Sequence, residues 1–209
     1  MFTYIFDFIL HLDTHLASFT AAYGVFTYLL LFIIIFCETG LVIFPFLPGD
    51  SLLFAAGALA ALGSLNFLLL LLLLMAAAIL GDTTNYLVGH FFGDRLIHLP
   101  HSPIKKAHLD KTHAFFTKHG GKTIILARFV PIVRTLAPFV AGLGTMHYST
   151  FIRFNIIGGI SWVCLFTGVG YFFGNLPSVK HNFSLVIFAI IGISLLPMIT
   201  EYLKSKKHP

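Results

Sequence analysis

The chain has 209 residues, of which 57% are apolar and only 10% are charged, with a formal net charge of +5. This composition excludes an ordinary soluble fold and predicts one membrane domain with several spans. The basic balance does not indicate nucleic-acid binding, because the lysines and arginines flank apolar segments and no recognisable binding motif accompanies them.

The first 62 residues predict a surface helix followed by a broken helical segment. Residues 1–20 have the pattern of an amphipathic helix lying on the membrane surface. The apolar run that follows is interrupted at Glu38 and again by Pro45, Pro48, Gly49 and Asp50. Proline breaks a helix, and irregular backbone at membrane depth is tolerated only where protein or a water-filled cavity satisfies it. We therefore expect residues 21–62 to form a re-entrant hairpin, with residues 44–50 inside the membrane.

The rest of the chain predicts three spans, a second surface helix and a second hairpin. Residues 67–92, 151–173 and 183–203 are each long and apolar enough to cross a bilayer. Residues 103–119 again look amphipathic. Residues 122–142 contain ARFVPIVRTLAP, which Pro131 and Pro138 break, and predict a shorter hairpin with residues 129–136 inside the membrane.

The distribution of charge predicts the topology. No lysine or arginine precedes Arg95, and the loop 93–122 and the C-terminal tail are both basic. The positive-inside rule therefore places both in the cytoplasm. Two similar segments, GHFFG at residues 89–93 and GYFFG at 170–174, close the two halves of the chain. Together with the topology, they predict an inverted repeat within a single domain, 1–209. Repeat one covers about 1–93, repeat two about 103–174, and a further span about 183–203.

Two acids and two bases lie inside the predicted hairpins: Glu38 and Asp50 in the first, Arg128 and Arg134 in the second. A charge near the bilayer centre costs about 2.5–3.5 kcal/mol, so four uncompensated charges would cost roughly 10–14 kcal/mol. We expect the acids and bases to meet. Two interpretations remain open: the arginines hold the hairpins together, or their guanidinium groups bind a phosphate, for which bidentate geometry suits arginine.

The acids also offer a route to proton coupling. An apolar environment favours the protonated carboxyl, whereas a nearby arginine favours the carboxylate. An acid that loses and regains its arginine would therefore gain and lose a proton. Within the span 67–92, Asp82, Asn85 and Tyr86 are spaced for one helical face, and we interpret them as structural, interhelical hydrogen-bonding groups.

Taken together, the motifs resemble those of the DedA family of bacterial inner-membrane proteins, related to the VTT-domain lipid scramblases. The resemblance rests on Glu38-Thr39, Pro48-Gly49-Asp50, Gly81-Asp82 with Tyr86, Arg128-Phe129-x-Pro131-x-x-Arg134, Ala141-Gly142 and Trp162. It implies a multi-pass inner-membrane transporter that uses the proton motive force to return an anionic lipid carrier, most often undecaprenyl phosphate, to the cytoplasmic leaflet. It further implies essential roles for Glu38, Asp50, Arg128 and Arg134, with no cofactor.

Other function classes fit the residues less well. An intramembrane hydrolase needs an activated nucleophile, and Ser51 lacks the second glycine of G-x-S-x-G. A channel normally carries rings of like charge. The eleven histidines include no H-E-x-x-H motif, so we expect no metal site. Because the chain shows neither an activated nucleophile nor a metal motif, we do not expect it to be an enzyme. A phospholipid scramblase and a cation/proton antiporter without a lipid substrate remain alternatives.

Overall fold

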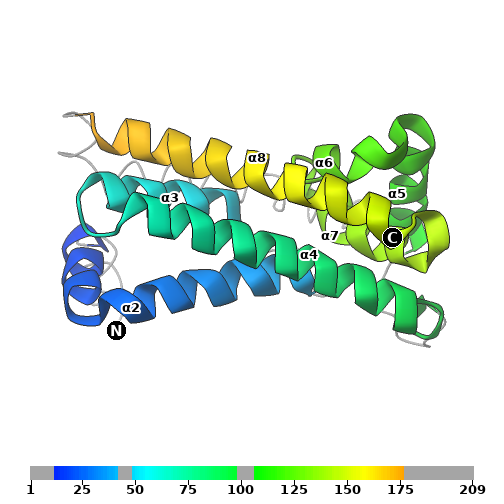
Figure 1. Cartoon of the computed structure of the whole chain (residues 1–209), viewed down its shortest axis with the longest axis horizontal. Coiled ribbons are helices and arrows are strands. Elements are labelled where there is room, and N and C mark those ends of the chain that lie inside the picture. The colour runs from blue at the N-terminus through cyan, green and yellow to red at the C-terminus, as the bar shows by residue number, and fades with distance from the viewer. Residues whose placement is uncertain (1–11, 42–48, 98–105, 177–209) are drawn as a thin grey trace, which may run out of the picture. The chain divides into compact units, whose positions relative to one another are not determined.

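The computed structural model describes residues 12–41, 49–97 and 106–176, and every regular element in these ranges is helical (Figure 1). The described elements are α2 (Leu12–Gly40), α3 (Gly49–Ala61), α4 (Phe67–Ile97), α5 (Lys106–His119), a 3-10 turn η1 (Gly120–Lys122), α6 (Thr123–Ala127), α7 (Pro131–Val140), a π-helical turn η2 (Ala141–Thr145) and α8 (Tyr148–Gly174). The predicted all-helical class is confirmed for this part of the chain.

Two of the predicted spans are present as long apolar helices. Residues 67–93 of α4 and 148–174 of α8 each form 27 consecutive helical residues, with mean hydropathies of 2.2 and 1.7. At 1.5 Å per residue such a helix is about 40 Å long, which exceeds the ~30 Å hydrocarbon core of a bilayer. By length and composition both helices can therefore cross a membrane. The third predicted span, 183–203, lies outside the described residues.

The structure describes the first predicted hairpin only in part. Helix α2 runs from Leu12 to Gly40, so its first residues overlap the predicted surface helix 1–20, of which residues 1–11 lie outside the described ranges. Helix α3 has 13 residues and is therefore about 20 Å long, too short to cross the hydrocarbon core. The tip, residues 42–48, lies outside the described ranges, so the hairpin and the inverted repeat stay predictions.

The chain divides into two compact units, whose boundaries fall within α2, α4 and α8. The first unit comprises residues 1–31, 48–72 and 164–209, and the second comprises 32–47 and 73–163. In the first unit α3 packs closely on α8. A Cβ on Gly57 would overlap the carbonyl of Thr167, and one on Gly170 would overlap the carbonyl of Phe54. Glycine at these two positions therefore allows the two backbones to touch.

The second unit contains a helix-break-helix segment within 122–142, where the sequence predicted the second hairpin, and the entry of this hairpin into the membrane stays a prediction. Helix α6 ends at Ala127, and Val130 is extended (φ −121°, ψ 104°) before Pro131 begins α7. Proline suits this first helical position because its missing N–H would have no partner there. Around this break α5, α6 and α7 pack together (Figure 1). Helix α5 matches the predicted amphipathic helix at 103–119, and its Leu109 and Phe116 pack on the core of α7.

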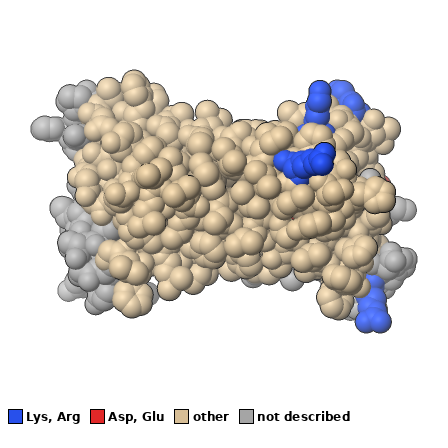
Figure 2. Space-filling view, in the orientation of Figure 1, with Lys and Arg blue, Asp and Glu red and all other residues tan. Residues whose placement is uncertain are grey.

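The described surface is largely uncharged on the face that Figure 2 shows, and the lysines and arginines coloured there belong to the second unit. The exposed basic residues described there are Arg95, Lys111, Lys118, Lys122 and Arg153. Many large apolar side chains are also exposed, including Leu68, Leu72, Phe91 and Phe172 at 58–68%. Such a surface fits contact with lipid rather than with water.

Candidate functional site

The break between α6 and α7 sets the positions of the two arginines. Arg128 directly follows the last residue of α6, and Arg134 lies in the first turns of α7, where its N–H makes a helical hydrogen bond to the carbonyl of Val130. Although they are only six positions apart in sequence, the extended backbone at Val130 leaves Arg128 at the end of α6 and Arg134 within α7. Each arginine therefore meets a different set of neighbours.

Arg134 pairs with Glu38, which is near the end of α2. Its Nη2 donates a hydrogen bond to Oε1 of Glu38 at 2.6 Å. Both side chains are largely shielded, with 12% of Arg134 and 4% of Glu38 exposed. This contact joins an acid and a base that are 96 residues apart, as the sequence led us to expect.

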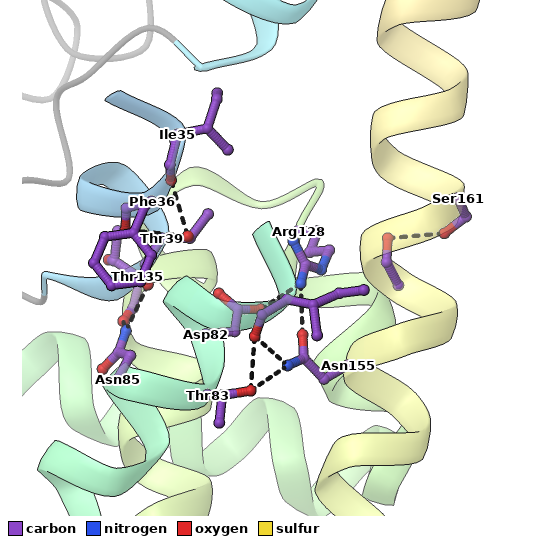
Figure 3. Close-up of polar contacts among 12 residues, drawn as sticks. Ile35, Phe36, Thr39, Asp82, Thr83, Asn85, Arg128, Thr135, Asn155 and Ser161 are labelled. Atoms are coloured by element: carbon purple, nitrogen blue, oxygen red, sulfur yellow. Dashed lines mark hydrogen bonds and ion pairs between the residues drawn. The ribbon is translucent and has the colours of Figure 1, made fainter. Parts of the chain in front are cut away.

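Arg128 pairs with Asp82 of α4, not with an acid of the first predicted hairpin. Its Nη2 donates to Oδ2 of Asp82 at 2.6 Å and to Oδ1 of Asn155 at 2.7 Å (Figure 3). The two side chains of the ion pair are only 3% and 6% exposed. Removing one partner of such a buried pair typically costs about 3–5 kcal/mol, because the other charge is left uncompensated.

Asn155 is held so that its oxygen faces Arg128. Its Nδ2 donates to the carbonyl of Ile79 at 3.0 Å and to Oγ1 of Thr83 at 3.2 Å. Since both amide protons point to acceptors on α4, Oδ1 is left to accept from the guanidinium. Figure 3 shows Asp82 and Asn155 directed at Arg128 from α4 and α8. The result is a buried polar network that joins three helices.

A buried tryptophan lies close to both arginines. Cζ of Arg134 is 4.3 Å from the ring centroid of Trp162, and Cζ of Arg128 is 5.7 Å from it. Trp162 is fully buried on α8. Both distances are within the range of cation–π attraction, which contributes about 2 kcal/mol when the pair is desolvated. Trp162 therefore brings the two arginines, each with its own acid, into one site.

Asn85 and Tyr86 make the interhelical hydrogen bonds that the sequence favoured. Nδ2 of Asn85 donates to the carbonyls of Thr39 and Thr135 at 3.1 and 2.8 Å. The hydroxyl of Tyr86 donates to the carbonyl of Met146 at 2.8 Å. These bonds connect α4 to the end of α2, to the middle of α7 and to the residue after η2, and so hold the helices that carry Glu38 and Arg134.

Asp82, which we interpreted from the sequence as an interhelical hydrogen-bonding group, accepts a hydrogen bond from Arg128 and is also the carboxylate that neutralises it. Asp50, which we had expected to meet an arginine, lies in the first turn of α3 in the other unit. Gly49 begins that helix, Pro131 begins α7, and Pro48 lies outside the described residues. The expected meeting of the hairpin acids and the arginines is described for Glu38 and Arg134, and the role of Asp50 stays a prediction.

Sequence reasoning missed the contribution of α8. Asn155 stands between Phe154 and Ile156 and belongs to no motif, although a buried amide in an apolar helix is itself a signal for an interhelical hydrogen bond. Trp162 entered only through the family resemblance. The helix also supplies Gly158 and Gly159, whose hydrogens face Arg128: a Cβ on Gly158 would lie 3.1 Å from Nε.

A separate cavity of about 540 Å³ lies beside the C-terminal part of α4. It is lined by Tyr86, Leu87, His90, Gly144, Met146, His147 and Tyr148. Among the described residues, no group of three histidine, cysteine or acidic side chains is placed to hold a metal ion.

The chain is similar to known membrane proteins over most of its length. The model of the VTT domain matches residues 47–172. Protein DedA of Escherichia coli is 56% identical over 207 residues, which cover 98% of this chain and 94% of that protein. The inner membrane protein YqjA of Escherichia coli is 40% identical over 157 residues, 72% of this chain and 69% of its own. An uncharacterized membrane protein of Mycobacterium leprae is 46% identical, covering 79% of this chain and 74% of its own. No solved structure matches the chain.

Proposed function

The chain belongs to the DedA family of VTT-domain membrane proteins, and from this premise we propose that it moves an anionic lipid carrier, most often undecaprenyl phosphate, across the inner membrane. The driving force is the proton motive force. Arg128 and Arg134 form the positively charged site for the lipid phosphate, and the carboxylates exchange protons. The protein performs transport and no covalent chemistry.

The observation that carries this proposal is a pair of buried arginines that share one tryptophan and each have a carboxylate partner. Guanidinium groups present several N–H donors in a plane, which suits the oxygens of a phosphate monoester. Inside a membrane, ionisable side chains are rare and usually mark a substrate or proton pathway. The exposed apolar side chains offer the lipid chain apolar contacts while its phosphate is bound.

Proton coupling follows if a carboxylate and the lipid phosphate compete for the same arginine. In the structure Glu38 occupies Arg134. When phosphate replaces it, Glu38 is left in an apolar environment without its cation, which favours uptake of a proton. Release of the phosphate restores the ion pair and returns the proton. Asp50 keeps the coupling role that the family resemblance implies, in the other unit.

The test is transport of undecaprenyl phosphate in proteoliposomes with an imposed pH gradient. We expect gradient-dependent flipping by the wild type and loss of the gradient dependence in Glu38→Gln, which cannot exchange a proton. Reconstitution and thermal stability of each variant provide the folding control. If the wild type flips the lipid at the same rate with and without the pH gradient, the protein is a scramblase. Proton flux that is tied to a cation gradient and is unaffected by lipid would indicate an antiporter, and either result would refute the proposal.

A further inference from the structure

The two arginines stand in different environments, although both lie in the site of the proposed function. Only 3% of the Arg128 side chain is exposed, against 12% for Arg134. Arg128 contacts two polar side chains from α4 and α8, and Arg134 packs against the ring of Trp162. A ligand that enters the site therefore finds two guanidinium groups that differ in how readily they can change partners.

Arg128 is enclosed by groups that depend on it. Asp82 is buried, and Asn155 is fixed in orientation by Ile79 and Thr83, so withdrawal of Arg128 would leave a charge and an amide oxygen without a donor. Nε of Arg128 makes no hydrogen bond within the described residues, but it faces Gly158 of α8 so closely that even a methyl group there would be crowded. The space beside Nε therefore has no room for a phosphate.

Arg134 has a different kind of contact. The ring of Trp162 lies 4.3 Å from Cζ, which is a cation–π distance. Cation–π attraction uses the face of a guanidinium, whereas hydrogen bonds use the N–H groups in its plane. Arg134 can therefore exchange one hydrogen-bond acceptor for another while it keeps its contact with the ring. Its greater exposure provides access for the incoming acceptor.

From these contrasts we propose a division of roles, which rests on the proposed function and refines it: Arg128 contributes positive charge to the site, and Arg134 makes the direct contact with the phosphate. Arg128 is a fixed cation, positioned by Asp82 and Asn155, that stays paired throughout the cycle. Arg134 is the arginine that leaves its carboxylate and takes the lipid phosphate, and Trp162 is the positioning residue that keeps its guanidinium in place during the exchange. Glu38 is thus the acid that competes with the ligand, and Asp82 is not.

Two acid-to-amide variants of nearly identical shape provide a matched test: Glu38→Gln and Asp82→Asn. The probe is undecaprenyl phosphate, titrated into the purified full-length protein in detergent micelles and measured by native mass spectrometry. Glu38→Gln removes the competitor of the phosphate, and we expect at least fivefold tighter binding. Asp82→Asn leaves Arg128 without its counter-ion, and we expect a lower melting temperature and no tightening.

Trp162 supplies a second readout, because it is the single tryptophan of the chain. We expect ligand to change its fluorescence emission in the wild type, and we expect Trp162→Leu to weaken binding about tenfold, with Trp162→Phe recovering part of the loss because it restores an aromatic face.

The possible failures can be told apart. Wild-type protein that binds no undecaprenyl phosphate would overturn the proposed function together with this inference. Normal wild-type binding with equal tightening in Glu38→Gln and Asp82→Asn would overturn the division of roles alone. Equal affinity in Trp162→Phe and Trp162→Leu would overturn the positioning role of the ring.

Discussion

Replacing Asn155 by leucine tests the buried network around Arg128. Leucine has a similar size, but it can neither accept from the guanidinium nor donate to Ile79 and Thr83, so three hydrogen bonds of 2.7–3.2 Å are lost. A hydrogen bond to a charged group contributes about 1.5–3 kcal/mol. Neutral interhelical bonds in membranes average ~0.6 kcal/mol each. The variant should therefore lose about 3–4 kcal/mol of its free energy of unfolding.

The assay is reversible unfolding in mixed micelles of a mild detergent and SDS, followed by far-ultraviolet circular dichroism. Ser161→Ala on the same helix is the matched control, because Ser161 is exposed and its hydroxyl donates only to the carbonyl of Gly158 within α8. It should change stability by less than about 0.5 kcal/mol. An Asn155→Leu protein within about 1 kcal/mol of the wild type would show that the network does not stabilise the fold, and the argument for a fixed Arg128 would fail with it.

Two further predictions concern glycines that allow close contacts. Gly158→Ala places a methyl group 3.1 Å from Nε of Arg128, so transport in the proteoliposome assay should fall at least severalfold. Gly168→Ala on the same helix is the control: its methyl group meets no atom within 4 Å, and the variant should remain active. Gly142→Ala forces a Cβ into the backbone of α4 and should lower stability by about 1–3 kcal/mol, while Gly24→Ala in α2 has open space and should be neutral or gain about 0.5–1 kcal/mol. Equal melting temperatures of the last two variants would contradict the close packing of η2 on α4.

The sequence by itself was sufficient for the two long helices that the structure describes and for the expectation that buried acids and arginines meet. Residues 67–92 and 151–173 were predicted as spans, and α4 and α8 cover both. The break at Pro131 was also predictable, because proline restricts its own backbone and that of the residue before it. These features depend on local backbone preferences and on the length of apolar runs, which can be read along the chain without knowing which helices pack together.

The membership of the site was decided by tertiary structure. Sequence alone indicated that buried acids must meet buried arginines, and Glu38 does contact Arg134. It did not indicate that Arg128 would meet Asp82, because helical spacing shows which residues share a face but not which helix that face contacts. Asn155 and Trp162 lie in a helix whose faces differ little in hydrophobicity, so the spacing of apolar residues did not distinguish them.

The physical reason is the separation along the sequence between the residues that interact. A helix closes its hydrogen bonds between residues four apart, so its existence is determined by neighbouring residues. Asp82 and Asn155 are 46 and 27 residues away from Arg128, and Glu38 is 96 residues away from Arg134. Such contacts form only after α2, α4, α7 and α8 have packed, at distances that glycines such as Gly81 and Gly158 permit. Local sequence determined the helices and the need for buried partners, and packing chose the partners.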